Sequence, residues 1–377
     1  MRIPLSLLAA AALAVLPQIA PAAPAGQPIV IGAILSITGL YAPLGEPESK
    51  ALRLAEKDIN AHGGIAGRPL HIIIQDDEGK GDTAAQLATG LIGQNVAAII
   101  GGSLTPTSLA IARVASAAKV VQLYPTPTSA VWNAKGGVAK YIFEVTPRNE
   151  IEATKLLSFT KGKLAAKKIA LLHDDAPYGT QGAAIATDEA HRQGLDIADD
   201  EPFPITSTDV TAQLGRIKAS GADTIVIWTA SPAAALAVRQ IRQLGLNVSV
   251  VGSTGIVSDN FLRIAGKDGD GVYADMDLNV THPNAPQRAF MNAYHAAYDA
   301  RPNNFASFVW DAAHLAALGL NATHGDASGD ALSAALVAMK PYAGSTGTFK
   351  FSESDHNGMT PEDVHIAIDR NAIWFTL

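Results

Sequence analysis

The sequence predicts an α/β protein with two doubly wound parallel-sheet lobes that are joined by a multi-strand hinge. Short, continuous apolar runs alternate with segments of helical period along most of the 377 residues, as in parallel sheets that helices cover on both faces. This alternation restarts near Lys168. Roughly 350 residues remain once an N-terminal leader is removed, which is more than one hydrophobic core usually supports.

The predicted strands are uninterrupted apolar runs, and many of the predicted helices end at a glycine, which is a common helix terminator. The predicted strands are Ile29–Leu35, Leu70–Gln75, Ala97–Ile100, Val120–Leu123, Lys168–His173, Thr224–Trp228 and Val248–Val251. The predicted helices are Glu46–His62, Thr83–Gln94, Ser108–Ala118, Glu150–Lys161, Thr180–Gln193, Val210–Ala219 and Pro232–Leu244. Two later helices, Ala285–Tyr298 and Phe305–Leu320, are expected to pack back on the first lobe.

No segment has the composition of a long flexible linker, so we expect several short crossings between the lobes. We assign residues 28–146 plus 278–346 to the N-terminal lobe and residues 147–277 plus 347–377 to the C-terminal lobe. A hinge made of several crossings is typical of proteins that close around a ligand.

Residues 1–25 have the pattern of a cleaved secretory signal peptide. Arg2 is their only charged residue, and the apolar stretch from Leu5 to Leu16 has the usual length of a signal core. Ala23-Pro24-Ala25 fits the cleavage pattern and leaves Gly26 as the first mature residue, with Ala20-Pro21-Ala22 as an alternative site. A membrane anchor is the other interpretation, but the apolar stretch is shorter than a bilayer span requires.

Composition and charge narrow the functional classes. A formal net charge of −7 argues against nucleic acid as a partner. The absence of cysteine excludes disulfides, thiolate nucleophiles, cysteine-bound metals and a lipid anchor on an N-terminal cysteine. Together with the signal pattern, this favours an exported protein of a bacterial periplasm, where a domain without disulfides is ordinary.

Two turns rich in small and hydroxyl side chains predict a site for an anion. The segment Gly101–Ser108 follows one apolar strand and leads into a helix, and Tyr124–Ser129 follows the next strand. Free N–H groups and the positive dipole end at a helix N-terminus attract a small anion, most plausibly a ligand carboxylate. Turns after adjacent parallel strands lie along one crevice of an open sheet.

Several segments resemble the branched-chain-amino-acid-binding type of periplasmic solute receptor, the leucine/isoleucine/valine-binding protein group of ABC importers. The most specific is Asp58–Leu70, which reads D-I-N-A-H-G-G-I-A-G-R-P-L. The other segments that carry the resemblance are Ile31–Gly39, Gln75–Glu78, Ile99–Gly102, His173–Gly179 and Arg239–Leu246. The resemblance covers nearly the whole chain after the leader. It implies the type I periplasmic-binding-protein fold and a binding function without chemistry.

The resemblance also implies where the first lobe holds its ligand. In that group, two loops bind the ligand's α-carboxylate and help to hold its ammonium. The matching positions here are Ser103, Leu104, Thr105, Thr126, Pro127 and Thr128. Backbone groups can serve at each position, except that Pro127 has no N–H, and the hydroxyls of Thr105 and Thr128 add donors. Capping of the following helix or turn is the alternative role of these two hydroxyls.

The opposite wall of the expected cleft departs from the resemblance. Thr254 stands where amino-acid binders carry an acidic residue that pairs with the ligand ammonium. Ala230 and Leu44 stand where aromatic residues are common. A buried ammonium without a carboxylate partner is unfavourable. A carboxylate without an α-ammonium, such as an aromatic or aliphatic acid, therefore competes with a branched-chain amino acid as the expected ligand.

Three aromatic residues, Tyr178, Trp228 and Phe308, are candidates for an apolar wall around the ligand, with core packing as the alternative role of each. No nucleophile–base pair, phosphate loop or metal-ligand spacing stands out, and we expect no catalytic residue, metal or cofactor. The expected partners are the small solute and an inner-membrane ABC permease, and the chain is expected to be a monomer. A ligand sensor without transport is the alternative, since both functions use one fold.

Overall fold

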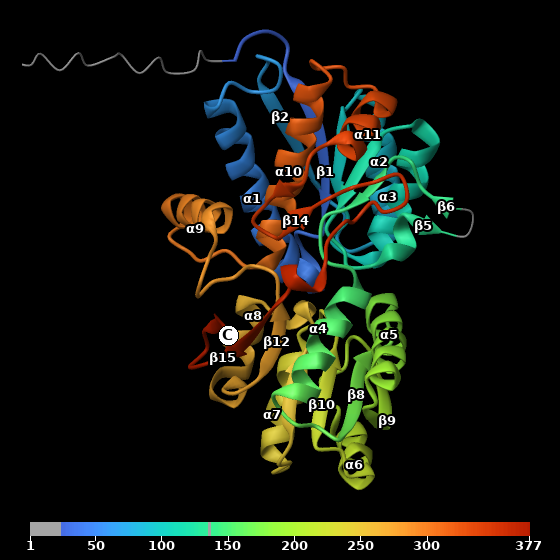
Figure 1. Ribbon diagram of the computed structural model, residues 1–377, viewed down its shortest axis with the longest axis vertical. Coiled ribbons are helices and arrows are strands. Elements are labelled where there is room, and N and C mark those ends of the chain that lie inside the picture. The colour runs from blue at the N-terminus through green and yellow to red at the C-terminus, as the bar shows by residue number, and fades with distance from the viewer. Residues whose placement is uncertain (1–23, 135–136) are drawn as a thin grey trace, which may run out of the picture.

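The computed structural model describes residues 24–134 and 137–377, which form two α/β lobes stacked end to end (Figure 1). One lobe contains a 5-stranded sheet and the other a 7-stranded sheet. The predicted signal peptide, apart from its last positions, lies outside the described residues. Of the helices in these ranges, none combines the length and the apolarity that a membrane span requires.

The first lobe is built on a parallel sheet with the strand order β2-β1-β3-β4-β7. Its strands are β1 (Ile29–Leu35), β2 (Leu70–Asp76), β3 (Ala98–Gly101), β4 (Val121–Tyr124) and β7 (Ile142–Glu144). Its helices are α1 (Ala42–Ala61), α2 (Gly81–Gly93), α3 (Thr105–Ala118), α9 (Ala285–Tyr298), α10 (Asn304–Ala322) and α11 (Gly329–Ala338). Two short pairs complete it: β5 (Asn133–Ala134) with β6 (Gly137–Val138), and β13 (Tyr342–Ala343) with β14 (Thr348–Phe349).

Helices cover both faces of this sheet, which explains its continuous apolar strands. Alternate side chains of β1 face opposite layers, as the pleat requires. Ile34 packs in the cluster that contains Leu91 of α2 and Ile111 of α3. Its neighbours Ala33 and Leu35 belong instead to the core that α1 and α10 cover. The expected return of α9 and α10 to the first lobe is confirmed, because both pack against α1.

The second lobe has the strand order β16-β15-β12-β11-β10-β8-β9. Its strands are β8 (Lys168–Asp174), β9 (Asp196–Phe203), β10 (Thr224–Trp228), β11 (Ser249–Gly252), β12 (Tyr273–Met276), β15 (His365–Asp369) and β16 (Trp374–Thr376). Its helices are α4 (Asn149–Gly162), α5 (Pro177–Gln193), α6 (Thr211–Ser220), α7 (Ala233–Gln243) and α8 (Asp259–Ala265). All pairs are parallel except those of β15, which is antiparallel to both of its neighbours. The predicted fold class is confirmed.

Three chain segments cross between the lobes: β7 to α4, β12 to α9, and β14 to β15. The last crossing lies later than the predicted boundary at residue 346. The N–H of Glu144 donates to the carbonyl of His356 (2.9 Å), and the amide of Asn357 donates to the carbonyl of Thr146 (2.6 Å). The imidazole of His356 also stacks on Phe143, with ring centroids 4.2 Å apart. These contacts hold the chain on the first lobe as far as residue 357.

Candidate ligand-binding cleft between the lobes

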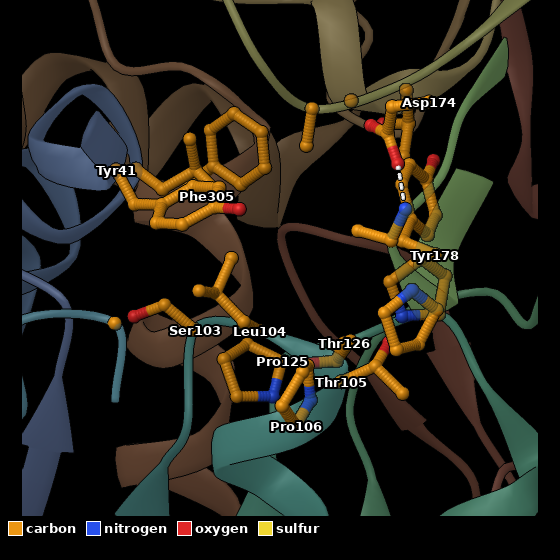
Figure 2. A pocket seen from close by; sticks show the side chains of 18 of the residues that line it. Tyr41, Ser103, Leu104, Thr105, Pro106, Pro125, Thr126, Asp174, Tyr178 and Phe305 are labelled. Carbon is orange, nitrogen blue, oxygen red and sulfur yellow. Dashed lines mark hydrogen bonds between the residues drawn. The ribbon is translucent and has the colours of Figure 1, made fainter. Parts of the chain in front are cut away.

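A cleft of about 660 Å³, counted with its open mouth, lies between the lobes (Figure 2). This volume is in the range of small-molecule sites. Loops at the carboxyl ends of strands from both sheets line the cleft, as is usual for open α/β sheets. The structure brings together the following predicted residues around it: Leu44, Ser103, Leu104, Thr105, Thr126, Pro127, Tyr178, Ala230, Thr254 and Phe308.

Two glycines shape the turn between β3 and α3. Gly101 has a φ of +128°, and a Cβ there would lie 1.9 Å from the carbonyl oxygen of Ile34. A Cβ on Gly102 would lie 2.4 Å from Oγ1 of Thr107. Only glycine permits such close approaches. The turn is therefore held tightly against β1, and it delivers the N-terminus of α3 to the cleft.

Helix α3 begins at Thr105, three residues before the predicted start at Ser108. Pro106 falls in the first turn, where its missing N–H costs no hydrogen bond. The hydroxyl of Thr107, not that of Thr105, makes the terminal contacts, since it accepts from the N–H of Leu104 at 3.2 Å. The hydroxyl of Thr105 is buried and has no hydrogen-bond partner within the described part of the chain. Capping therefore does not explain this hydroxyl.

Ser103 uses its hydroxyl inside the first lobe rather than in the cleft. Its Oγ accepts from the N–H of Ser36 (3.0 Å) and donates to Oε2 of Glu48 (2.5 Å). Glu48 and Asp77 are fully buried beneath this loop. Desolvation raises the pKa of Glu48 to about 8, although the bond from Ser103 opposes the shift. Only the backbone of Ser103 remains available to a ligand.

In the second hydroxyl-rich turn, Tyr124–Ser129, the two threonine hydroxyls make different contacts. Oγ1 of Thr126 donates to the carbonyl of Gly102 (2.9 Å), so it ties the two cleft loops together. Thr128 does not line the cleft. Its Oγ1 donates instead to Oε1 of Gln181 in α5 (3.1 Å), across the gap between the lobes. It makes no side-chain cap of the turn that follows it.

The wall on the second lobe is built around Asp174, at the end of β8. Its Oδ1 accepts from the N–H of Ala176 (3.0 Å), and its Oδ2 accepts from the hydroxyl of Thr229. The residue is 1% exposed, and desolvation raises the pKa of its carboxyl. Among the described residues that line the cleft, no other side chain is acidic or basic.

Tyr178 lines the cleft, but Trp228 does not. In β10, the side chains of Val226 and Trp228 lie on the face of the sheet that α4 and α5 cover. The indole packs directly on Gly182 of α5, where a Cβ would lie 2.0 Å from its Nε1. Trp228 therefore supports the wall from behind, with its ring centroid 6.3 Å from that of Tyr178.

The remaining predicted residues form the apolar part of the cleft. Leu44, Phe305 and Phe308 make one buried cluster, against which Leu104 and Ala230 pack. Thr254 is 1% exposed, and its Oγ1 accepts from Nδ2 of Asn304 in α10 (2.7 Å). The position where the resemblance implies an acidic residue in amino-acid binders is thus occupied by a hydroxyl that is already bonded within the protein.

Sequence reasoning did not include Tyr41, Asp174 or Phe305 among the site residues, although all three line the cleft. Asp174 could have been found, because it directly follows the apolar run of a predicted strand whose carboxyl end faces the crevice. Tyr41 and Phe305 have no such signal, since they reach the cleft only through the packing of α1 and α10. In the described ranges, no group of three or more histidine, aspartate or glutamate side chains could hold a metal ion.

Comparisons with known proteins agree with this architecture. The family model of the periplasmic binding proteins matches residues 28–365. The chain is 29% identical to an amino acid binding protein of Pseudomonas aeruginosa, over 63% of this chain and 63% of the relative's length. It is 25% identical to the Leu/Ile/Val-binding protein homolog 3 of Brucella melitensis, over 86% of this chain and 88% of the relative.

Among solved structures, the branched-chain amino acid transporter substrate-binding protein LivJ of Streptococcus pneumoniae, in complex with isoleucine, is 26% identical. It superposes with a TM-score of 0.83 over 93% of this chain and 99% of that structure. The family model covers most of the chain. This chain belongs to the periplasmic binding protein family, in its type I, leucine/isoleucine/valine-binding-protein-like group, whose members bind solutes and are not enzymes.

Proposed function

We propose that this protein is the periplasmic receptor of an ABC importer and that it binds a branched-chain amino acid or a related small carboxylate between its lobes. The hydroxyl of Thr105 carries this proposal. It is buried at the N-terminus of α3, beside the cleft, and has no partner among the described residues. A ligand carboxylate would satisfy this donor and would interact favourably with the helix dipole.

The remaining contacts follow from the position of each loop. The ligand docks first on the first lobe, and the second lobe then closes over it and excludes water, which strengthens the polar contacts. Thr128 contributes through Gln181, and Trp228 contributes by supporting Tyr178. The proposed contacts of the ligand itself are Leu44, Ser103, Leu104, Thr105, Thr126, Pro127, Tyr178, Ala230, Thr254 and Phe308.

The relatives support a small carboxylate as the ligand, since LivJ of Streptococcus pneumoniae is described in complex with isoleucine. A receptor for aromatic or other non-amino-acid carboxylates is the second candidate. The neutral Thr254 and the aromatic pair Phe305 and Phe308, whose ring centroids are 6.0 Å apart, favour it. The two candidates differ only in what the ligand carries besides its carboxylate.

The cellular setting is part of the same proposal. The signal pattern of residues 1–25 directs the chain to the periplasm, where the mature monomer presents its closed form to an inner-membrane permease. A sensor that is not coupled to transport would use the same cleft and closure. Deletion of the gene distinguishes the two, because uptake of the ligand falls if the protein is a transport receptor and is unchanged if it is a sensor.

Binding itself is tested with the purified mature chain, starting at Gly26. A thermal-shift screen of amino acids and of aliphatic and aromatic carboxylates identifies ligands, because only those that prefer the folded state raise the melting temperature. Calorimetric titration of the hits into wild type and Thr105→Val then places the carboxylate. Hits that bind both proteins equally would show that the carboxylate lies elsewhere.

A further inference from the structure

We infer that the cleft has a second polar end, formed by Asp174 and Tyr41, and that its ligand carries a hydrogen-bond donor there in addition to its carboxylate. The donor is a hydroxyl or an amino group. This inference rests on the proposed function, because it assigns a ligand class to the same cleft.

Asp174 has acceptor capacity that the protein leaves unused. Each carboxylate oxygen can accept two hydrogen bonds, yet each takes one here. Oδ1 accepts from the N–H of Ala176 (3.0 Å), and Oδ2 accepts from the hydroxyl of Thr229. The carboxyl lies in the cleft wall and is 1% exposed. Each oxygen therefore keeps a second acceptor position, and because the residue lines the cleft, a donor of a bound ligand can fill it.

Tyr41 presents its hydroxyl from the other side of the cleft. Figure 2 shows Tyr41 and Asp174 on opposite sides of the cavity, with the phenol oxygen pointing into it. The ring packs on Gly79, where a Cβ would lie 2.9 Å from Cδ2 of Tyr41. Burial, followed by the charges of Asp174 and Asp175, raises the pKa of Tyr41 to about 12. The phenol is therefore a neutral group that can both donate and accept.

The charge balance of the cleft explains why a donor is needed. No lysine, arginine or histidine is found among the described residues that line it. Closure over a purely apolar tail would strip Asp174 of water without replacing the lost hydrogen bonds, which is unfavourable. A second carboxylate at this end would meet Asp174 as a like charge. The cleft thus favours a donor and rejects a second acid.

This donor site is distinct from the position of Thr254. Asp174 ends β8, whereas Thr254 follows β11, and β10 lies between these strands in the sheet. Two strand spacings separate the positions by roughly 10 Å. The apolar cluster of Leu44, Phe305 and Phe308 lies in the same cleft and can hold the body of the ligand. The ligand inferred here therefore has a carboxylate, an apolar body and a separate hydroxyl or amino donor, which selects the second candidate of the proposed function over a branched-chain amino acid, whose side chain carries no donor.

Matched carboxylates that differ only at the far end test this inference. The probes are benzoate, 4-hydroxybenzoate, 4-aminobenzoate and terephthalate, together with hexanoate, 6-hydroxyhexanoate and 6-aminohexanoate. In calorimetric titrations we expect at least one hydroxy or amino probe to bind at least tenfold more tightly than its plain parent. Terephthalate should bind more weakly than benzoate. The hydroxy and amino members show which donor the cleft takes.

Two variants test whether Asp174 and Tyr41 cause the preference for the donor-bearing probe. Asp174→Asn and Tyr41→Phe should each reduce the preference for the donor-bearing probe by at least fivefold, while the plain parent keeps its affinity. Asp188→Asn is the matched control, because this aspartate of α5 is exposed and does not line the cleft; its preference should equal that of wild type. Melting temperatures confirm that each variant is folded.

The outcomes separate this inference from the proposed function. Equal affinities for plain and donor-bearing probes, or a preference that survives both cleft variants, would overturn the donor site and leave carboxylate binding intact. If no carboxylate or amino acid binds at all, the proposed function fails and the donor site fails with it.

Discussion

The hydroxyl of Thr128 donates a hydrogen bond to the side-chain amide oxygen of Gln181 at 3.1 Å, and the two residues belong to different lobes. Thr128 is itself fixed, since its carbonyl accepts from the phenol of Tyr124 (2.8 Å). Gln181 lies in the second turn of α5. The bond therefore connects the loop after β4 with helix α5 of the other lobe, and we expect it to stabilise the closed form of the proposed function.

Thr128→Val should weaken ligand binding without disturbing the ligand's own contacts. The lost bond is neutral and contributes about 0.5–1.5 kcal/mol, so the dissociation constant should rise about two- to tenfold, mainly through faster release. Stopped-flow and calorimetric measurements check this. Thr128→Ser keeps the hydroxyl and should bind as wild type does. A double-mutant cycle with Gln181→Leu that gives no coupling would show that the bond does not stabilise closure.

Thr105→Val should separate binding from stability. The hydroxyl of Thr105 has no partner among the described residues, so its removal should leave the free energy of unfolding unchanged or slightly increased. The affinity for a carboxylate ligand should fall by about tenfold or more, because a hydrogen bond to a charged group contributes about 1.5–3 kcal/mol. Urea unfolding and calorimetric titration measure the two effects.

Thr107→Val is the control for this experiment and should show the opposite pattern. Its hydroxyl accepts from the N–H of Leu104 and donates to the carbonyl of the same residue. Loss of these terminal contacts should destabilise α3 by about 1 kcal/mol. Equal losses of stability in both variants would contradict the assignment of Thr105 to the ligand.

Most of the sheet could be predicted from the sequence, because parallel central strands are continuous apolar runs. The edge strand β9 is not a continuous apolar run, and it was therefore not predicted. It runs from Asp196 to Phe203 and contains four acidic residues, of which Asp196, Asp199 and Asp200 are exposed or half-exposed and Glu201 is buried, and this is the composition of a solvated sheet edge rather than of a core strand. The strands β12, β15 and β16 were missed as well, since each is short and the last two join the sheet in antiparallel fashion.

The candidate site was predictable only where it consists of loops that follow strands. The loops at Thr105 and Thr126 were found because a strand, a turn and a helix follow one another in the sequence. Whether Trp228 reaches the cleft depends on which face of the sheet its side chain occupies. A fully buried strand lacks the alternation of polar and apolar residues that would indicate this face. Tyr41 and Phe305 depend on tertiary packing, for which the local sequence carries no signal.

The stability of the protein should fall as the pH rises from about 5 to 8, and Glu48 should account for part of this change. Burial raises the pKa of Glu48 from 4.5 to about 8 in the folded state. Between these values the native protein holds a proton that the unfolded chain has lost, so each pH unit reduces stability by up to about 1.4 kcal/mol per such group. The effect levels off above the folded-state pKa.

Glu48→Gln should remove this contribution while keeping an acceptor for the hydroxyl of Ser103. Urea unfolding at pH 5 to 9 should show the variant gaining stability relative to wild type as the pH rises. Other buried carboxyls such as Asp275, whose pKa burial also raises, act equally in both proteins and cancel in the difference. Glu46→Gln, on the exposed side of the same helix, is the control. Parallel profiles for wild type and Glu48→Gln would rule out Glu48 as the titrating group.

Gly182→Ala should destabilise the second lobe and disturb the cleft wall, although residue 182 does not line the cleft. The added Cβ would lie 2.0 Å from Nε1 of Trp228 and 2.3 Å from its Cδ1. The indole is 1% exposed and packs beside Tyr178, so it cannot move without displacing that residue. Overpacking of this kind costs about 1–3 kcal/mol, and ligand affinity should fall together with stability.

Gly215→Ala, in helix α6 of the same lobe, is the matched control because a Cβ there meets no atom within 4 Å. It should stabilise the protein by about 0.5–1 kcal/mol. If Gly182→Ala proved as stable as Gly215→Ala in urea unfolding, the close contact between α5 and the indole of Trp228 would be wrong, and with it the role of Trp228 as the support behind the wall.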